Sequence, residues 1–398
     1  MHSHTLRGSL LAILALLVCV QARGQGTQIG SNSSSRGARL AQYDGAMVAE
    51  PDGMAGQGMI VQPGGEAWGC DPYETQGGWS NNMFGVPCGE SCQGRGAGFI
   101  AGGGVYFIKP MWTNNQAGIV TGPGPSLGRL EINNDHEFAP FAFLGFVGPN
   151  GFGVRGRAWY YEYAANDVVF TLPAGNTVAS QSPLFAATPL VNTNVSSATP
   201  GDVFRVSSNL NLYVYDLEAF QAIDHDQWTW TFSGGVRYAI IRQQYVATIT
   251  PVAVGGPAAQ SVNSLHRFSG WGPTISLEGR RAFGQTGLAL YGNARGSLLF
   301  GDSTQDVTST LSVGPAFAHP AVNASAARWS PLSIFEFEIG GEYGYWLGTT
   351  ARLFARGGLV GQAWLNAGNA ANAGLDGLPD DNANMGFTGY RATVGVDY

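Results

Sequence analysis

The feature that most constrains the fold of this chain is an alternation of long and short connections between ten strand-like segments. The segments run near residues 99–112, 136–147, 151–163, 207–221, 227–242, 265–281, 287–301, 331–345, 350–365 and 386–398. Long connections follow the odd-numbered segments, and short ones follow the even-numbered segments. A membrane barrel with both chain ends in the periplasm has short turns on that side and longer loops outside. This alternation of connection lengths therefore predicts an all-β, transmembrane antiparallel β-barrel of about 10 strands, within a range of roughly 8 to 14.

The long connections cover residues 113–135, 164–206, 243–264, 302–330 and 366–385. They are polar, and several of them contain proline. Connecting segments of this kind run over protein surfaces and vary in conformation. We expect them to be extracellular loops, with the short turns at the periplasmic end.

The last nine residues alternate strictly between apolar and polar side chains. Tyr390, Val394 and Tyr398 share one parity, while Arg391 and Asp397 share the other, so an extended chain separates them onto two faces. A strand of a soluble β-sandwich has the same period, but it has no reason to keep the alternation of loop lengths. An aromatic final residue after such a strand resembles the C-terminal signal of bacterial outer-membrane barrels. We therefore expect the barrel assembly machinery to be a partner.

Charged residues in the segments lie on the parity opposite the apolar residues. A charge on the lipid face near the midplane costs roughly 2 to 4 kcal/mol, so these charges are expected to point into the barrel. The candidate lumen-lining residues are Arg155, Arg157, Asp216, Glu218, Arg237, Glu278, Arg280, Arg295, Glu336, Glu338, Glu342, Arg352, Arg356, Arg391 and Asp397. Eight arginines thus face seven acids. Two interpretations remain open: a network of ion pairs that fills a narrow interior, and a charged channel lining that selects among ions and small solutes.

Two segments depart from this pattern. Glu162 has the lipid-facing parity, close to the expected loop end of its segment. In segment 207–221, Leu210 and Val214 share parity with Asp216 and Glu218, and we expect a β-bulge to reset the alternation between them.

The composition agrees with a barrel in outer-membrane lipid. Only 12% of the 398 residues are charged, 59 are glycine and 12% are aromatic, which suits strands that bend and pack on lipid, although a secreted β-solenoid has a similar composition. The formal net charge of -7 argues against nucleic acid as a partner. Lys109 is the only lysine, and the arginines are suited to multidentate pairing with carboxylates in a confined space.

The N-terminal part of the chain is of a different kind. Residues 1–24 have the basic start, apolar run and small-residue cleavage site of a secretory signal peptide. Residues 25–98 are rich in Gly, Ser and Gln and are expected to form a flexible periplasmic segment. This segment holds Cys70, Cys88 and Cys92, for which a local disulfide with one spare thiol is favoured over a metal site, because no histidine lies nearby.

Several motifs resemble those of one family. They are rich in Gly and aromatic residues, and they follow in order as Asp216-Leu217-Glu218, Gly234-Gly235-Val236-Arg237-Tyr238, Phe268-Ser269-Gly270-Trp271-Gly272-Pro273, Leu290-Tyr291-Gly292-Asn293 and Ser297-Leu298-Leu299-Phe300-Gly301. In this order they resemble the Legionella-type pore-forming major outer membrane proteins, over roughly residues 99–398. The resemblance implies an outer-membrane porin that can associate into homo-oligomers. Residues 25–98 depart from the pattern of that family.

Two histidines are candidates for catalytic groups. His136 lies between Asp135 and Glu137 near the outer end of its segment, and His225 lies in an expected periplasmic turn. Neighbouring side chains on a strand point to opposite faces, so neither histidine forms an aligned pair with its sequence neighbours. The sequence also contains no glycine loop for phosphates and no His-Glu-x-x-His helix. We therefore predict no enzyme activity, cofactor or metal.

The sequence favours a bacterial outer-membrane barrel that forms a pore for passive diffusion of ions or small solutes through a charged lumen. The alternative is a non-conducting structural or adhesive barrel, in which the ion network closes the lumen and the loops bind partners. An outer-membrane hydrolase is a third, less favoured hypothesis, which would need His136 for activity.

Overall fold

The structure is a computed structural model that describes residues 97–113, 116–123, 127–180, 195–252, 259–310, 322–348, 351–371 and 383–398. The predicted signal peptide at 1–24 lies outside the described residues. The predicted flexible segment 25–98 lies outside them as well, apart from its last two residues, and so do Cys70, Cys88 and Cys92.

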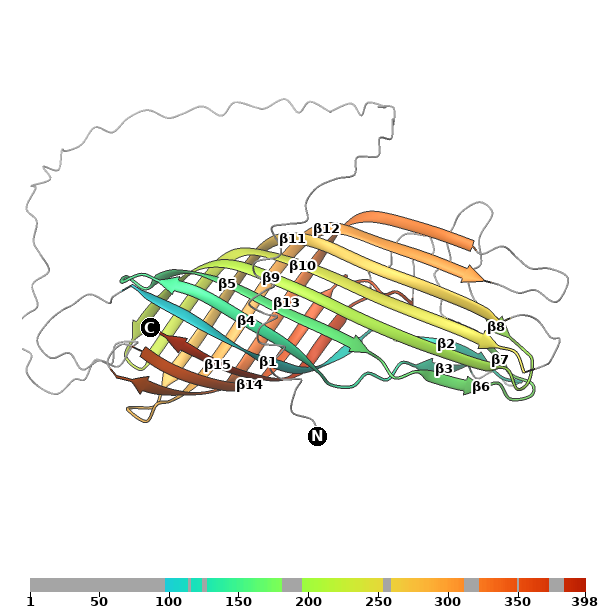
Figure 1. Cartoon of the computed structure of the whole chain (residues 1–398), viewed down its shortest axis with the longest axis horizontal. Helices are drawn as coiled ribbons and strands as arrows, with labels where there is room; N and C mark the ends of the chain where they lie inside the picture. The colour runs from blue at the N-terminus through green and yellow to red at the C-terminus, as the bar shows by residue number, and fades with distance from the viewer. Residues whose placement is uncertain are drawn as a thin grey trace, which may run out of the picture. The chain divides into compact units, whose positions relative to one another are not determined.

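Ten antiparallel strands of the described residues close into a ring (Figure 1). They are β1 (Gly98–Trp112), β4 (Glu137–Val147), β5 (Phe152–Ala164), β9 (Val203–His225), β10 (Trp228–Thr250), β11 (Gln260–Ala282), β12 (Leu288–Thr310), β13 (Val322–Leu347), β14 (Ala351–Leu365) and β15 (Met385–Asp397). Each strand pairs with its neighbours in the order just given, and β15 pairs with β1 to complete the ring. A closed ring leaves no unpaired strand edge to be satisfied in lipid. The predicted barrel, including its strand number, is confirmed.

The start of β1 and the end of the last strand, β15, meet where the barrel closes. The backbone nitrogens of Phe99 and Tyr398 each donate to the other residue's carbonyl oxygen over 2.8 Å. The four short turns lie at this same end, and each contains a residue with positive φ: Gly151 at 78°, Asp226 at 54°, Gly287 at 76° and Gly348 at 68°. Short turns mark the periplasmic end of an outer-membrane barrel. The opposite end, with the long connections, is therefore extracellular.

Strands β9 to β13 are longer than the sequence pattern predicted. They contain 23 to 26 residues each, whereas a tilted strand needs only about 9 to 11 residues to cross a bilayer. Most of the extra residues lie at the extracellular end, where water replaces lipid and the outward positions become polar, as at Arg242 and Gln244 on β10. The sequence segments ended where lipid-type alternation ended, which is why they were too short.

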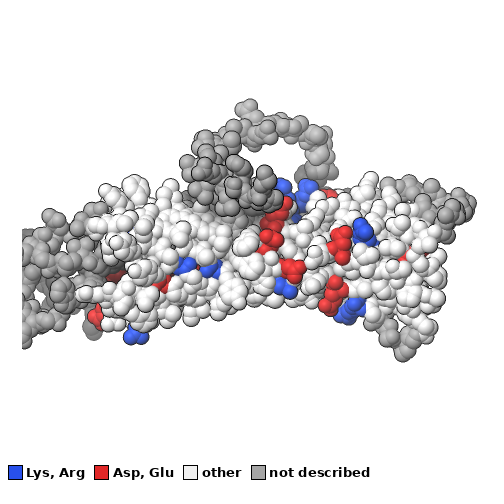
Figure 2. Space-filling view, turned by 60° about the horizontal axis from the view of Figure 1, so that its bottom comes forward, with Lys and Arg blue, Asp and Glu red and all other residues white. Residues whose placement is uncertain are grey.

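The outer surface beside the periplasmic turns is apolar. Exposed side chains there include Phe335, Phe337 and Ile339 on β13, with 55%, 62% and 53% of their surface accessible. Trp228 and Trp230 are exposed in the same way near the turn that precedes β10. Charged residues form only small groups on the face shown in Figure 2. The predicted separation of apolar and charged faces thus places an uncharged band against lipid.

The first two long connections contain short strands that the sequence pattern did not predict. A four-stranded sheet is formed by β2 (Gln116–Thr121), β3 (Leu127–Glu131), β7 (Thr177–Ser180) and β8 (Ser196–Ser197). β6 (Val168–Thr171) pairs with β9 beyond the end of β5 and extends the barrel wall. Strands of two to six residues are too short to show a clear period, which is why the sequence pattern did not predict them. The described residues contain no helix that is long and apolar enough to cross a membrane.

The expected bulge in β9 is absent, which corrects the sequence interpretation. β9 pairs residue for residue with β10 from Val203 to His225, without a register shift. Leu210, Leu212 and Val214 therefore point inward together with Asp216, and all four are buried. The alternation needed no reset, because these inward positions of β9 belong to the buried hydrophobic core on the extracellular side of the ion pairs.

Candidate functional site in the barrel interior

All fifteen charged residues that the sequence singled out take part in ion pairs with one another. The fifteen residues are Arg155 and Arg157 of β5, Asp216 and Glu218 of β9, Arg237 of β10, Glu278 and Arg280 of β11, Arg295 of β12, Glu336, Glu338 and Glu342 of β13, Arg352 and Arg356 of β14, and Arg391 and Asp397 of β15. Each of these residues belongs to a strand that is hydrogen-bonded to a neighbour on both sides, and this pairing fixes the position of its backbone. Whether these residues line a path for solutes stays a prediction.

The central group of ion pairs crosses the bore of the barrel. Arg157 on β5 donates to Asp216 at 3.0 Å and to Glu336 at 3.3 Å. Arg237 on β10 contacts the same two carboxylates at 2.6 Å and 2.5 Å. In the ring of ten strands, β5 and β13 lie opposite each other, so the Arg157–Glu336 contact spans the interior. The side chains of Arg237 and Asp216 have 0% exposure, which means that side chains fill the barrel at this level.

A second group lies nearer the periplasmic turns and is organised around Glu342 on β13. The Glu342 carboxylate forms ion pairs with Arg280 at 2.9 Å, with Arg356 at 2.7 Å and with Arg352. Arg352 contacts Asp397 at 3.1 Å in turn. Three guanidinium groups around one carboxylate compensate for its burial.

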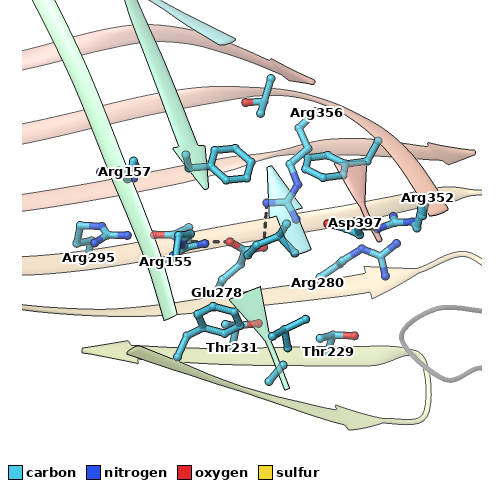
Figure 3. Close-up of a pocket in the computed structure, with 18 of the residues that line it drawn as sticks. Arg155, Arg157, Thr229, Thr231, Glu278, Arg280, Arg295, Arg352, Arg356 and Asp397 are labelled. Carbon is cyan, nitrogen blue, oxygen red and sulfur yellow. Dashed lines mark hydrogen bonds and ion pairs between the residues drawn. The ribbon is translucent and has the colours of Figure 1, made fainter. Parts of the chain in front are cut away.

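A cavity of about 140 Å³ lies in this periplasmic half. Figure 3 shows Arg155, Glu278 and Arg356 directed toward one another in the cavity wall, and Arg356 pairs with Glu278 at 3.0 Å. Aromatic side chains, among them Phe143 and Phe220, form another part of the wall. The cavity is therefore partly cationic and partly apolar.

The extracellular side of the central ion pairs is an aromatic and aliphatic layer. Trp159 and Trp364 meet edge to face with ring centroids 6.2 Å apart, and Phe387 lies 6.3 Å from Trp364 and 5.4 Å from Tyr161. These four side chains are between 0% and 3% exposed. Side chains packed in this way exclude water from the layer. The interior thus consists of two layers, an apolar one toward the extracellular end and a charged one toward the periplasmic end.

The segment that follows β14 folds into this apolar layer. Ala370 accepts a hydrogen bond from Gln305 of β12 at 3.3 Å and donates to Gln243 of β10 at 2.8 Å, while the carbonyl of Ala367 lies 3.0 Å from His266 Nε2 of β11. Positive φ angles at Asn366, 64°, and Gly368, 76°, allow the chain to reverse sharply. We call residues 366–371 the inner segment. It reaches from one side of the barrel to the wall formed by β10, β11 and β12.

The loop sheet is attached to the interior as well. Tyr245 of β10 is fully buried and donates to the carbonyl of Ala117 in β2 at 2.6 Å. A Cβ on Gly118 would fall 2.8 Å from the ring of Phe204, so only glycine allows β2 to approach β9 this closely. The sequence interpretation missed the inner segment, Gln243, His266 and Gln305, because they lie beyond the membrane-type alternation and carry no motif.

The two histidines considered for catalysis lie outside this arrangement. His136 is exposed and stacks on the ring of Phe107 with centroids 5.1 Å apart. His225 is the last residue of β9 at the periplasmic end; its side chain is 81% exposed, and its Nε2 lies 3.7 Å from the carboxylate of Asp226. Neither histidine reaches the cavity or the ion pairs described above.

A closed ten-stranded barrel with an apolar outer band and an ionic interior defines this chain as an outer-membrane β-barrel protein of bacteria. A family model described as the Legionella pneumophila major outer membrane protein precursor matches residues 154–398. The chain belongs to this family, as the sequence motifs indicated. The matched part begins within β5 and includes every charged residue of the interior.

Comparison with solved structures finds other outer-membrane barrels at low similarity. The outer membrane protease OmpT from Escherichia coli is 10% identical, with 76% of this chain and 96% of that chain covered and a TM-score of 0.36. A FadL homologue from Pseudomonas aeruginosa is 10% identical, covering 76% and 90% with a TM-score of 0.23. The Pseudomonas putida toluene transporter TodX is 8% identical, covering 75% and 89% with a TM-score of 0.24. No curated protein matches the chain.

Proposed function

We propose that the protein is a narrow outer-membrane pore for ions or small solutes and that the described conformation is its closed state. Family membership and the charged interior support a pore. The filled interior supports closure, because the Arg157–Glu336 contact and the buried Arg237 occupy the bore. The proposal assigns no catalytic role to His136 or His225.

The observation that carries the closed state is the position of the inner segment. Its backbone is held by Gln243, His266 and Gln305 at the level of the aromatic layer, and Ala370 is fully buried there. Trp159, Trp364 and Phe387 form much of this layer, and an ion that lost its water against them would gain few polar partners in return, which is costly. Opening therefore requires the inner segment to leave the wall of β10 to β12. The three hydrogen bonds are weak enough, at about 0.5–1.5 kcal/mol each, for such a rearrangement.

The test is single-channel recording of the refolded, full-length protein in planar bilayers. The double variant Gln243→Ala/Gln305→Ala removes both side-chain contacts to Ala370, and Gln244→Ala is the matched control, because Gln244 bonds Asn263 at 2.9 Å instead. We expect rare, brief openings of the native protein and of the control, and at least tenfold higher open probability for the double variant.

Two results would contradict the proposal in different ways. Long-lived, steady conductance of the native protein would show that the closed state is not the resting one. Silence of both the native protein and the double variant, with correct folding, would favour the second candidate, a non-conducting structural or adhesive barrel. The buried ion pairs and the aromatic layer are the observations that favour this second candidate.

A further inference from the structure

The cavity in the periplasmic half has a wall of unequal charge. Seven arginines line it but only two acids, Glu278 and Asp397. The carboxylates that balance the other arginines, such as Glu218 and Glu342, lie behind the wall and outside the lining. The surface that faces the cavity therefore consists mainly of guanidinium groups, although the whole set of charges is almost neutral.

Several hydrogen-bond donors in this wall have no partner among the described residues. The Nε atoms of Arg155 and Arg391 are buried and unpartnered. Thr393 lines the cavity, is only 3% exposed, and its hydroxyl has no partner either. Arg280 uses Nε to bond Glu342 at 2.9 Å, which leaves its two terminal nitrogens available in the described structure. Buried polar groups without partners are costly, so donors gathered around one cavity indicate a ligand that accepts hydrogen bonds.

The cavity has access to solvent from one end. Arg155, Arg280 and Arg356 retain 20%, 17% and 19% side-chain exposure, whereas Arg237 and Asp216 in the central group have none. The lining includes Val147 and Thr229, which lie beside short turns. A solute can therefore enter from the periplasmic end and is stopped by the central ion pairs.

We propose that this cavity binds a small oxyanion from the periplasm, such as phosphate or the carboxylates of a short organic acid. Guanidinium groups match both oxyanions with bidentate, charge-assisted hydrogen bonds. The volume of about 140 Å³ accommodates a ligand of this size, and the aromatic part of the wall accommodates a short carbon chain. Binding does not depend on conduction, so the site can exist whether or not the barrel opens.

The test is isothermal titration of the folded, full-length protein in detergent at constant ionic strength, with inorganic phosphate and with succinate. Sodium chloride is titrated in parallel to detect general screening. Arg280→Gln removes free donors while Glu342 keeps Arg352 and Arg356, and its control is Arg281→Gln, an exposed neighbour on the same strand. Thr393→Val removes the unpartnered hydroxyl, and its control is Thr388→Val on the outer face of β15.

We expect at least one of the two oxyanions to bind, with a Kd raised about tenfold or more by Arg280→Gln and about threefold by Thr393→Val. Both controls should stay within about twofold. The anion that binds more tightly identifies the class of solute. The proposal is overturned if neither oxyanion binds, if chloride gives the same heat, or if the cavity variants bind like their controls. Should Arg280→Gln fail to fold, Thr393→Val with its control decides alone. None of these outcomes depends on channel recordings.

Discussion

Arg237→Met tests directly whether the ion pairs that cross the bore hold the barrel together. Arg237 has no exposed side-chain surface and connects Asp216 of β9 with Glu336 of β13. Methionine keeps most of the side-chain length but removes the charge and every donor. The variant leaves both carboxylates buried with fewer partners.

The expected loss of stability follows from the contacts that remain. Removing one partner of a buried ion pair costs about 3–5 kcal/mol, because the other charge stays buried without compensation. Here Asp216 and Glu336 both keep Arg157, at 3.0 Å and 3.3 Å, so the lower end of this range, about 3 kcal/mol, applies. With a urea dependence of about 1–3 kcal/mol/M, the unfolding midpoint should fall by about 1–3 M.

The assay is urea unfolding in lipid vesicles, followed by tryptophan fluorescence. Arg242→Met is the matched control, since Arg242 is an exposed arginine on the same strand. Adding Asp216→Asn to Arg237→Met should recover part of the loss, because it removes one of the two carboxylates that lost a partner. Equal midpoints for Arg237→Met and Arg242→Met would refute the reasoning. A double variant no more stable than the single one would attribute the loss to packing rather than to charge.

Three further predictions test the other layers of the barrel. Trp364→Ala should cost about 3–5 kcal/mol, measured by the same unfolding assay, because its indole is fully buried in the aromatic layer. Ile339→Lys places a charge in the lipid-facing band and should lower the free energy of unfolding in vesicles by about 2–4 kcal/mol. Its control is Ser325→Lys, which lies nearer the extracellular end of β13 and beside Asp306 and should leave the stability almost unchanged. Arg352→Gln/Arg356→Gln should lower the unfolding midpoint in the same assay, because it removes two of the three guanidinium partners of the buried Glu342; an unaltered midpoint would show that this group of ion pairs does not stabilise the barrel.

The strands and their outward faces could be predicted because lipid imposes one rule on every strand. Phe335, Phe337 and Ile339 must be apolar where they meet lipid, and Glu336 and Glu338 must then face inward. Any sequence that obeys this rule shows a period of two, and the short turns show which ends are periplasmic. The charged residues of the interior could be predicted for the same reason, because in a strand that crosses lipid a charged residue must occupy an inward-facing position.

The apolar layer could not be found in this way, because it breaks the assumption that inward positions are polar. Leu210, Leu212 and Val214 suggested a bulge, although they continue the inward face of β9 without interruption. The outward positions there are polar, at Asn209 and Asn211, so the pattern is the reverse of the membrane alternation, and a period of two alone does not tell which face is inside. The position of the inner segment could not be predicted for another reason. Its hydrogen bonds with Gln243 and Gln305 join parts of the chain that are far apart in sequence.

The order of the layers also bears on what the arginines can do. In the described conformation, a solute from outside meets the aromatic layer around Trp159 and Trp364 before it reaches any arginine of the network. Charges placed behind an apolar barrier cannot select among ions that never arrive, whereas charges beside the periplasmic opening meet solutes freely. Arg155 and Arg280, both partly exposed, occupy that second position. Three residues with unpartnered donors, Arg155, Arg391 and Thr393, line the cavity beside these arginines, so an anion that enters from the periplasm meets donors that the described ion pairs leave unused.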